Sequence, residues 1–328
     1  MNRLLLLPFL GIFFQGTQYA TIGTIERFDA SLNKIIKKNA VAEIIAEGFE
    51  WSEGPLWLEK QNMLLFSDIP VNTIYKWTEA SGKEVYLNPS GYTGVAPRGG
   101  ETGSNGLLLN KDGKLVMCQH GNRQIAMMNA DVSIPKPYFT TIAGTYQSKK
   151  FNSPNDAVYK SNGDIFFTDP PYGLEKNMDD PLKEISFQGV YRATTSGEIK
   201  LLTDTITRPN GIAFMPGEKK LLIGNSDGDK PYIYAYDIGA NDTLMGCKIF
   251  CNGAALPVEE KSGFDGIKVD RNGNVFASGP GGIWVLDKEG KILGLIKIPG
   301  RTSNCAFSPD EKTLYITADM YVLRVKMR

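Results

Sequence analysis

The sequence predicts an all-β fold, a six-bladed β-propeller of four-stranded blades whose ring is closed by an N-terminal strand. The first observation is a repeat: six times, an acidic or amide residue opens a short apolar run that is followed by a turn and a second apolar run. The opening residues are Glu53, Asn105, Asn155, Asn210, Asp265 and Asn304. Their spacings of 52, 50, 55, 55 and 39 residues lie in the range typical of propellers and other repeat architectures. The second observation is composition, since 35 Gly and 18 Pro among 328 residues supply many turns.

The first twenty residues differ from the repeats and predict a signal peptide over residues 1–20. Arg3 supplies a positive charge, Leu4–Phe14 is an apolar run too short to span a bilayer, and Ala20 is a suitable cleavage point. A buried N-terminal strand and a membrane anchor remain as alternatives. On the signal-peptide interpretation the protein is exported, periplasmic or secreted, and residues 21–328 form a single propeller domain without a membrane span.

Each repeat contains further strand signals in a constant order. The second run is β-rich and is led by a polar turn such as NKDG, KSNG, MPGE, DRNG or SPDE. These second runs include GKLVMCQ, GDIFFTD, KKLLIGN, GNVFASG and KTLYITA. Further runs follow as TIYKW, QIAMMN, GVYRAT, YIYAYD, GIWVLD and VLRVKM. They predict three or four strands per repeat, and a β-sandwich, although compatible with such strands, would not explain the repeated opening residue.

The last repeat lacks an outer strand, because the chain stops at Arg328 soon after VLRVKM. The segment Val41 to Ala46, VAEIIA, precedes the first repeat and has no other partner. We expect it to complete the last blade, which closes the ring and removes two open sheet edges.

Charge and cysteine content exclude several classes of function. Lys plus Arg and Asp plus Glu each total 36, so no basic excess indicates a nucleic-acid partner. Four Cys are too few for a disulfide scaffold; Cys247 and Cys251 lie too far apart in a strand to be bridged, and Cys118 and Cys305 are expected in the core. The stretch RGGETGSN over residues 98–105 lacks the GK[ST] of a phosphate-binding loop and is expected as a rim loop over a substrate, so no organic cofactor is indicated.

The inner strands of a propeller line its channel, so residues at one repeat position meet as a ring at one mouth. Here that ring contains one Glu, four Asn and one Asp. Oxygen donors without thiolates or clustered His suit a hard cation; Ca²⁺ is favoured because it accepts several oxygens in flexible geometry, and Zn²⁺, Mg²⁺ and Mn²⁺ remain candidates. The alternative is that Asn-Gly and Asp-Gly pairs only make turns. Six positions in register, including Glu53, which is not a turn former, favour the metal site.

Six motifs occur in order between about Glu47 and the C-terminus. They are EGP at Glu53, SPND at Asn155, DPPYG at Asp169, RPNG at Asn210, FDGIKVD at Asp265 and SNCAF at Asn304. Together they resemble the SMP-30/gluconolactonase/luciferin-regenerating family of calcium-dependent propeller lactonases. CQHGNR at His120 and the DPPYG motif further resemble the bacterial gluconolactonase branch of that family.

The resemblance implies a ligand set and a reaction. The family's metal ligands correspond here to Glu53, Asn155, Asn210 and Asp265, and Asp265 is also the implied general base that activates water. The metal would polarise the carbonyl of a lactone. The implied activity is hydrolysis of a small-molecule sugar lactone such as D-glucono-1,5-lactone to the aldonic acid.

Five further residues are candidate substrate contacts on weaker grounds. Asn105 and Asn304 occupy ring positions but are not assigned as ligands. His120 is the only His of the chain, and Asp169 and Tyr172 belong to the DPPYG turn. Each of these three could instead be a structural residue.

Two alternatives to a lactonase remain at the level of the sequence. One is a metal-dependent aryl-esterase or organophosphate hydrolase, and the other is a non-enzymatic propeller that binds a ligand or a protein. A polar cavity with Asn, Asp and Tyr would favour sugar lactones, whereas an aromatic cavity would favour aryl substrates. The residues indicate no oligomeric state.

Overall fold

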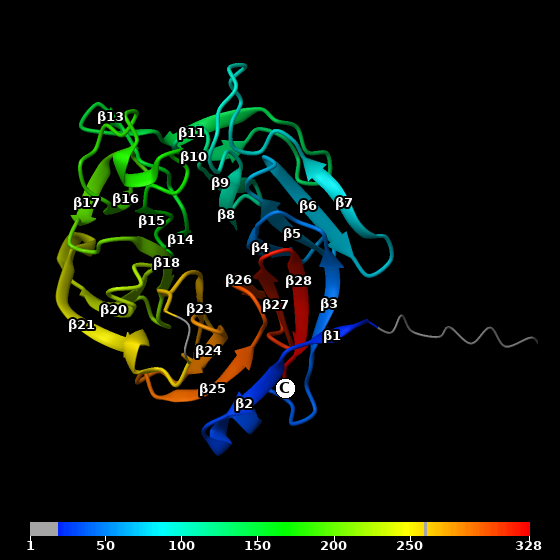
Figure 1. The fold of residues 1–328 in the computed structure, drawn as a ribbon. Helices are drawn as coiled ribbons and strands as arrows, with labels where there is room; N and C mark the ends of the chain where they lie inside the picture. Colours follow the sequence, from blue (N-terminus) through cyan, green and yellow to red (C-terminus); the bar gives the residue numbers. More distant parts are fainter. Residues whose placement is uncertain (1–18, 259–260) are drawn as a thin grey trace, which may run out of the picture.

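Six antiparallel sheets are arranged in a ring in the computed structural model of the protein, which describes residues 19–258 and 261–328 (Figure 1). Four sheets contain four strands in sequential order. The fifth sheet adds one N-terminal strand to four such strands, and the sixth adds two N-terminal strands to three. The prediction of an all-β, six-bladed β-propeller of four-stranded blades is confirmed. The signal peptide predicted over residues 1–20 lies almost entirely outside the described residues.

The first three blades follow the first three repeats. Blade one contains β4 (Ser52–Leu58), β5 (Met63–Asp68), β6 (Thr73–Thr78) and β7 (Gly82–Leu87). Blade two contains β8 (Ser104–Leu109), β9 (Leu115–Gln119), β10 (Gln124–Met128) and β11 (Phe139–Ala143). Blade three contains β14 (Ala157–Tyr159), β15 (Ile165–Asp169), β16 (Gly189–Ala193) and β17 (Ile199–Thr203). A small hairpin of β12 (Thr145–Tyr146) and β13 (Lys149–Lys150) lies in the connection between blades two and three.

The last three blades follow the remaining repeats. Blade four contains β18 (Pro209–Phe214), β19 (Lys220–Asn225), β20 (Tyr232–Ile238) and β21 (Leu244–Asn252). Blade five contains β22 (Ile267–Val269), β23 (Val275–Gly279), β24 (Gly282–Leu286) and β25 (Ile292–Lys297). Blade six contains β26 (Thr302–Phe307), β27 (Thr313–Ala318), β28 (Tyr321–Lys326) and β3 (Ala42–Glu47). Within the described residues, helix occurs as four short 3₁₀ segments, η1 (Ala30–Lys34), η2 (Asn177–Asp179), η3 (Ala240–Asp242) and η4 (Gly253–Ala255).

An N-terminal strand closes the ring, as the sequence predicted. β3 pairs antiparallel with β28, so that Ala46 lies opposite Val322 and Glu43 lies opposite Arg324. In Figure 1 the blue β3 and the red β28 lie side by side. Because the two ends of the propeller share one sheet, the ring cannot open without breaking this ladder.

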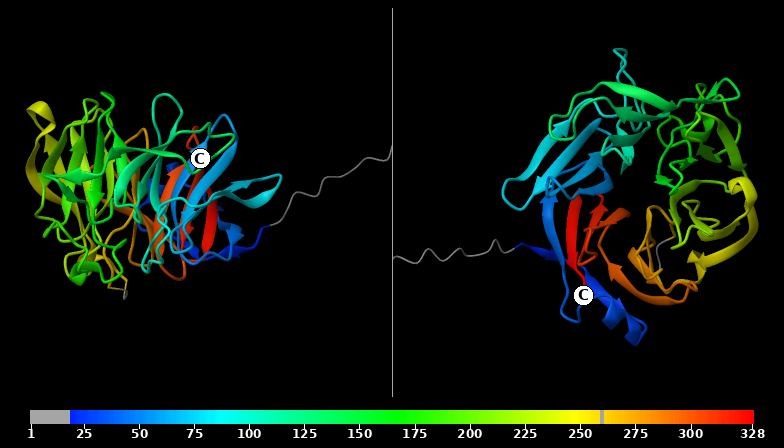
Figure 2. Two further views of the ribbon diagram at one scale, coloured as in Figure 1. Left: turned by 90° about the horizontal axis from the view of Figure 1, so that it is seen from above. Right: turned by 180° about the vertical axis from the view of Figure 1, so that it is seen from behind.

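Two short strands add to the ring beyond the prediction. β1 (Thr21–Ile22) pairs with β3 in blade six, and β2 (Thr24–Arg27) pairs with β25 in blade five. Gly23 joins them with a φ of +72°, and a Cβ at this position would lie 1.9 Å from the Lys297 carbonyl oxygen, so only glycine fits. The N-terminal segment therefore bridges two blades along the outer edge of the ring, next to the C-terminus (Figure 2).

The core lies between neighbouring blades, in six apolar clusters. The cluster between blades five and six, for example, contains the fully buried Ile283, Ile316 and Cys305. Cys118 is also fully buried, and all four cysteines are free, which confirms that the chain is not a disulfide scaffold. Neighbouring blades are thus joined by apolar contacts between the faces of their sheets. Within the described part of the chain, no helix is both long enough and apolar enough to span a membrane.

Candidate functional site

The six opening residues lie where the inner strands are irregular. In four blades the register between the inner strand and its neighbour shifts beside the opening residue, at Glu53/Leu56, Ser104/Leu107, Pro209/Ile212 and Thr302/Asn304. In blades three and five the regular strand begins two residues after the opening residue, at Ala157 and Ile267. A bulge redirects the side chain at its position, so these irregularities turn the opening residues away from the regular alternation of the sheet.

The glycine that follows an opening residue lets neighbouring blades approach closely. Gly106 donates its backbone N–H to the Asn155 carbonyl at 2.9 Å, and Gly211 donates to the Asp265 carbonyl at 3.1 Å. A Cβ at Gly211 would lie only 2.1 Å from that Asp265 oxygen. The Asn-Gly pairs at 105–106 and 210–211 therefore lie within inner strands and serve inter-blade contact, which contradicts the alternative that they only make turns.

Five of the six opening residues line one cavity of about 420 Å³. They are Glu53, Asn105, Asn155, Asn210 and Asp265. A cavity of this size is in the range of small-molecule sites. The cavity is also lined by Glu101, Tyr172, Arg208, Ser226 and Arg301, so most of its wall is polar.

Four side-chain oxygens in this cavity are buried without a hydrogen-bond partner among the described residues. They are Oδ1 of Asn105, Oδ1 of Asn155, Oδ1 of Asn210 and Oδ1 of Asp265. Buried polar atoms are nearly always paired, so four unpaired acceptors in one cavity fit a site for a cation or for a hydrogen-bond donor of a ligand. Together with the Glu53 carboxylate they form a set of hard oxygen donors that fits Ca²⁺ or a similar cation.

The carboxylates of the cavity oppose each other electrostatically. Burial raises the pKa of Asp265 well above its ordinary range, and the charges of Glu53 and Asp156 raise it further. Burial also raises the pKa of Glu53, with a contribution from Asp156. A divalent cation at this position would relieve both effects. The described residues contain no cluster of three or more His, Cys, Asp or Glu side chains suited to a metal, because here most of the donors are amide oxygens.

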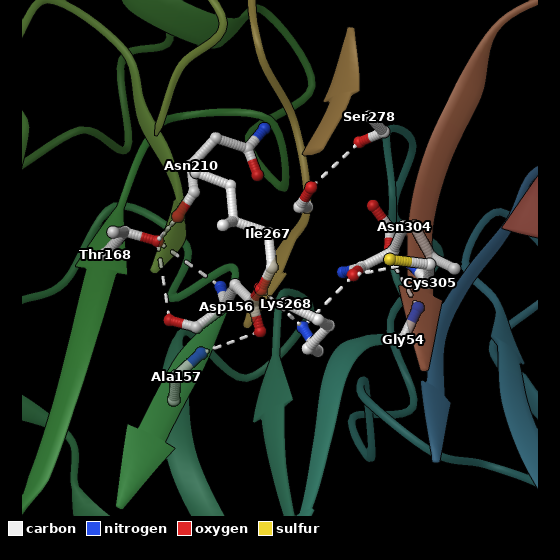
Figure 3. Close-up of polar contacts among 12 residues, drawn as sticks. Gly54, Asp156, Ala157, Thr168, Asn210, Ile267, Lys268, Ser278, Asn304 and Cys305 are labelled. Atoms are coloured by element: carbon white, nitrogen blue, oxygen red, sulfur yellow. Dashed lines mark hydrogen bonds and ion pairs between the residues drawn. The ribbon is translucent and has the colours of Figure 1, made fainter. Parts of the chain in front are cut away.

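Asn304, the sixth opening residue, faces a second cavity instead. Its Oδ1 accepts from Lys268 Nζ at 3.1 Å and from the Cys305 backbone N–H at 2.9 Å (Figure 3). Its Nδ2 donates to Glu53 Oε2 at 3.2 Å. The second cavity follows the same inner strands farther along, where Asp156 and Lys268 also line it. The structure therefore separates Asn304 from the other five and makes it a support for Glu53.

Sequence reasoning missed the ion pair between the two cavities. Lys268 Nζ lies 3.4 Å from Asp156 Oδ2, and Figure 3 shows the lysine reaching from β22 between Asp156 and Asn304. Asp156 directly follows the predicted ligand Asn155, and Lys268 lies three residues after Asp265. The available signal was a charged residue within each of the apolar segments DAVY and GIKV, since a buried charge needs a partner.

Tyr172 lies in the cavity, whereas His120 does not line it. The Tyr172 hydroxyl shares a 2.6 Å hydrogen bond with Ser226 Oγ, and both residues line the cavity wall. His120 is fully buried, and its Nδ1 lies 3.0 Å from Oε2 of Glu101, which does line the cavity. Glu101 belongs to the 98–105 stretch that the sequence predicted as a rim loop, but it was not itself selected as a site residue.

Asp169 is fully buried and organises the chain in front of an opening residue. Its two carboxylate oxygens accept from the backbone N–H groups of Asn152 and Ser153, each at 2.8 Å. Asp68 occupies the equivalent place in blade one and accepts from the backbone N–H of Trp51 at 3.0 Å. The recurrence in two blades indicates a structural role that positions the loop carrying each ligand candidate.

Known proteins resemble this chain over most of its length. A family model described as the SMP-30/gluconolactonase/LRE-like region matches residues 51–319. A gluconolactonase from Zymomonas mobilis is 38% identical over 322 residues, which cover 94% of this chain and 87% of the relative. The solved structure of a gluconolactonase from Xanthomonas campestris superimposes with a TM-score of 0.80 at 28% identity, over 95% of this chain and 98% of the other. A calcium-binding regucalcin from Agrobacterium tumefaciens shares the fold with a TM-score of 0.66 at 18% identity, over 87% of this chain and 94% of the other.

Proposed function

The chain belongs to the SMP-30/gluconolactonase/LRE-like family, and from this premise we propose that it is a metal-dependent lactonase that opens a sugar lactone such as D-glucono-1,5-lactone to the aldonic acid. Such a lactonase is a hydrolase acting on a carboxylic ester bond. The observation that carries the proposal is the set of four unpartnered oxygens that, with Glu53, line one polar cavity.

The cation is proposed to be Ca²⁺, held by Glu53, Asn155, Asn210 and Asp265. Two carboxylates balance its charge, and the remaining donors are neutral oxygens of the kind that Ca²⁺ accepts. Asn105 offers an equivalent unpartnered oxygen to the same cavity. When bound, the cation supplies a Lewis acid for the lactone carbonyl and stabilises the charge that develops on its oxygen.

The chain's own groups have separate roles in the proposed reaction. Asp265 has one buried unpartnered oxygen, Oδ1, and a side chain that remains partly exposed to the cavity. Beside the cation its carboxylate would be ionised and would accept the proton of the attacking water. Asn304 and the backbone N–H of Gly54 both donate to Glu53 Oε2 and so fix the orientation of that carboxylate.

The lining of the cavity supports a sugar lactone over the alternatives. Hydroxyl, amide and charged groups predominate, and Trp51 and Tyr172 are the aromatic side chains among the described lining residues. An aryl ester or an aryl organophosphate would be expected to meet a more aromatic wall. The similarity to gluconolactonases favours an enzyme over a purely binding propeller.

The test measures hydrolysis of D-glucono-1,5-lactone by residues 21–328 in a pH-stat. The rate is measured without chelator, then with chelator, and then after Ca²⁺ or Zn²⁺ is restored. We expect activity to disappear on chelation and to return with the metal. Asp265→Asn should lower kcat by about a hundredfold or more, while the matched surface variant Asp112→Asn retains it. Absence of any rate above the spontaneous one, in every metal tried, would refute the gluconolactonase assignment.

Export is a separate part of the proposal and rests on the sequence pattern of residues 1–20. The protein is proposed to be periplasmic or secreted, with a mature N-terminus near Thr21, where β1 begins. Mass spectrometry of the N-terminal peptide of protein from the cell envelope and the medium tests this. An intact Met1 peptide on all of the protein would contradict cleavage.

A further inference from the structure

Glu101 is a carboxylate of the cavity to which the proposed reaction assigns no role. It lies in the connection between β7 and β8, four residues before Asn105, and it lines the cavity together with the candidate metal ligands. Its side chain is 32% exposed, so it reaches the cavity from the rim. Glu101 and Asp265 both line this cavity.

His120 engages one oxygen of Glu101 from behind the cavity wall. The distance from His120 Nδ1 to Glu101 Oε2 is 3.0 Å, and the imidazole is fully buried. Both ring nitrogens are buried and neither makes a hydrogen bond of good geometry among the described residues, but Nδ1 lies against the Glu101 carboxylate. A proton on Nδ1 would face that carboxylate, whereas a proton on Nε2 would be a buried N–H with no acceptor nearby, so the Nδ1 tautomer is favoured.

The imidazole is held in place by the surrounding backbone. His120 donates its backbone N–H to the Gly103 carbonyl at 3.1 Å, which ties it to the strand entry that follows Glu101. A Cβ at Gly173 would lie 2.7 Å from the His120 Cβ, so the DPPYG turn packs directly against the histidine. The Arg98 guanidinium donates to the carbonyls of Gly121 and Gly173 and fixes the rim loop from its other end.

The remaining oxygen of Glu101, Oε1, has no hydrogen-bond or ion-pair partner within the described part of the chain. One oxygen thus lies against a buried histidine, while the other is free at the rim of the cavity. A carboxylate restrained in this way loses little side-chain entropy when it accepts a hydrogen bond from a ligand.

From this geometry we infer that Glu101 is a specificity-determining residue that accepts a hydrogen bond from a ring hydroxyl of the lactone, and that His120 is its positioning residue. The inference deepens the proposed function and rests on it, because it concerns the lactone in the same cavity. Glu101 would distinguish hydroxylated lactones from alkyl lactones, because its carboxylate is left with an unpaired charge when the ring hydroxyl is missing.

The kinetics of Glu101→Gln on two substrates test whether Glu101 binds a ring hydroxyl. With D-glucono-1,5-lactone we expect KM to rise about tenfold and kcat to change much less, because a charged hydrogen bond made throughout the reaction is lost. With δ-valerolactone, which has no ring hydroxyl, KM should stay unchanged. The surface variant Glu198→Gln is the matched control. An unchanged KM for the gluconolactone overturns the inference, as does an equal loss on both lactones, which would place Glu101 at the reacting carbonyl.

A double-mutant cycle tests whether His120 positions Glu101. His120→Leu should raise KM for D-glucono-1,5-lactone as Glu101→Gln does, and the double variant should show no further rise. His120→Asn, which keeps a donor near the Nδ1 position, should restore part of the loss. Thermal unfolding of each variant separates a general loss of stability from the effect on KM. If the double variant instead showed a rise in KM equal to the product of the two single rises, the positioning role of His120 would be overturned.

Binding of D-gluconolactam, a hydrolysis-resistant analogue that retains the ring hydroxyls, provides a readout without turnover. Calorimetry with and without CaCl₂ should show about tenfold weaker binding to Glu101→Gln than to the wild type, and no such difference for δ-valerolactam. If the wild type binds the lactam in this manner but hydrolyses no lactone, the proposed function fails and the inference about Glu101 stands. If hydrolysis occurs and binding ignores the substitution, the inference alone fails, and if neither ligand binds and no lactone is hydrolysed, both fail.

Discussion

At the scale of single residues, hydrogen bonding divides the opening residues into two groups. The amide oxygens of Asn105, Asn155 and Asn210 have no partner among the described residues, whereas Asn304 uses its amide on Lys268 and Glu53. The same residue type at the same repeat position therefore serves as a candidate ligand in three blades and as a support in another. The difference arises from a lysine on β22 that occupies the amide oxygen of Asn304.

Asn105 provides a direct test of the ligand set. Because its Oδ1 has the same unpartnered state as those of Asn155 and Asn210, Asn105→Ala is expected to weaken Ca²⁺ binding by about tenfold or more. Calorimetric titration measures this effect, with the exposed Asn129→Ala as control. Unchanged affinity would restrict the ligand set to the four residues implied by the family resemblance.

Asp169 should make stability depend on pH. Burial raises its pKa from 3.8 to about 7, although two backbone N–H donors oppose the shift. The folded protein then keeps a proton that the unfolded chain releases, so this group's contribution to the free energy of unfolding falls as pH rises from about 4 to about 7 and is level above that. In urea unfolding, the stability of the wild type relative to Asp169→Asn should decrease between about pH 4.5 and pH 7.5. A relative stability that increases over this range would show that the carboxylate is ionised in the fold.

At the scale of elements, hydroxyl groups on the second strands join neighbouring blades at the ring. Ser67 on β5 donates to the Asn105 carbonyl at 3.0 Å, Thr168 on β15 donates to the Asn210 carbonyl at 2.7 Å, and Ser278 on β23 donates to the Ser303 carbonyl at 2.6 Å. Each accepting carbonyl lies on or beside an inner-strand irregularity, where regular ladder pairing is interrupted. The hydroxyls therefore satisfy the backbone that the irregularities leave open.

Thr168→Val removes one of these contacts without a change of shape. It leaves a buried carbonyl unsatisfied and should lower the free energy of unfolding by about 1–3 kcal/mol. Chemical denaturation measures the loss, and Thr140→Val on the exposed part of β11 is the matched control. Equal stability of the two variants would mean that other groups satisfy the Asn210 carbonyl.

At the scale of the whole molecule, stability depends on closure of the ring. β3 supplies the fourth strand of blade six, and Arg324 on β28 joins it through a 2.7 Å contact with Glu43. Apolar clusters lie between every pair of neighbouring blades, including blades six and one. Opening the ring at one sheet would therefore expose a strand edge and weaken the packing on either side.

Two truncations separate closure from the outer additions. Residues 51–328 lack β3 and should not unfold cooperatively, because β28 becomes an open edge and the apolar cluster with blade one loses Ile45, Ala46 and Phe49. Residues 29–328 lack only β1 and β2 and should retain a single transition at a lower Tm. Differential scanning calorimetry compares both with residues 21–328. A cooperative transition of unchanged Tm for residues 51–328 would contradict the role of β3.

The sequence by itself determined the propeller, its six blades, its closing strand and the positions that form the ring. The reason is that a repeat is local: each unit of apolar runs and polar turns specifies its own strands, and an N-terminal strand without a partner matches a last blade that lacks one. The EGP, PNG and DG motifs indicated the family for the same reason, because each is a short segment within an inner strand or directly before one.

The tertiary structure alone decided which side chains share the cavity. It placed Asn304 against Lys268, His120 behind the wall and Glu101 in front of it, and it added β1 and β2 to two different blades. None of these outcomes follows from the repeat, since each depends on what the neighbouring blade presents at the point of contact. The direction of a side chain at an irregular strand position is set by such contacts between segments far apart in the sequence.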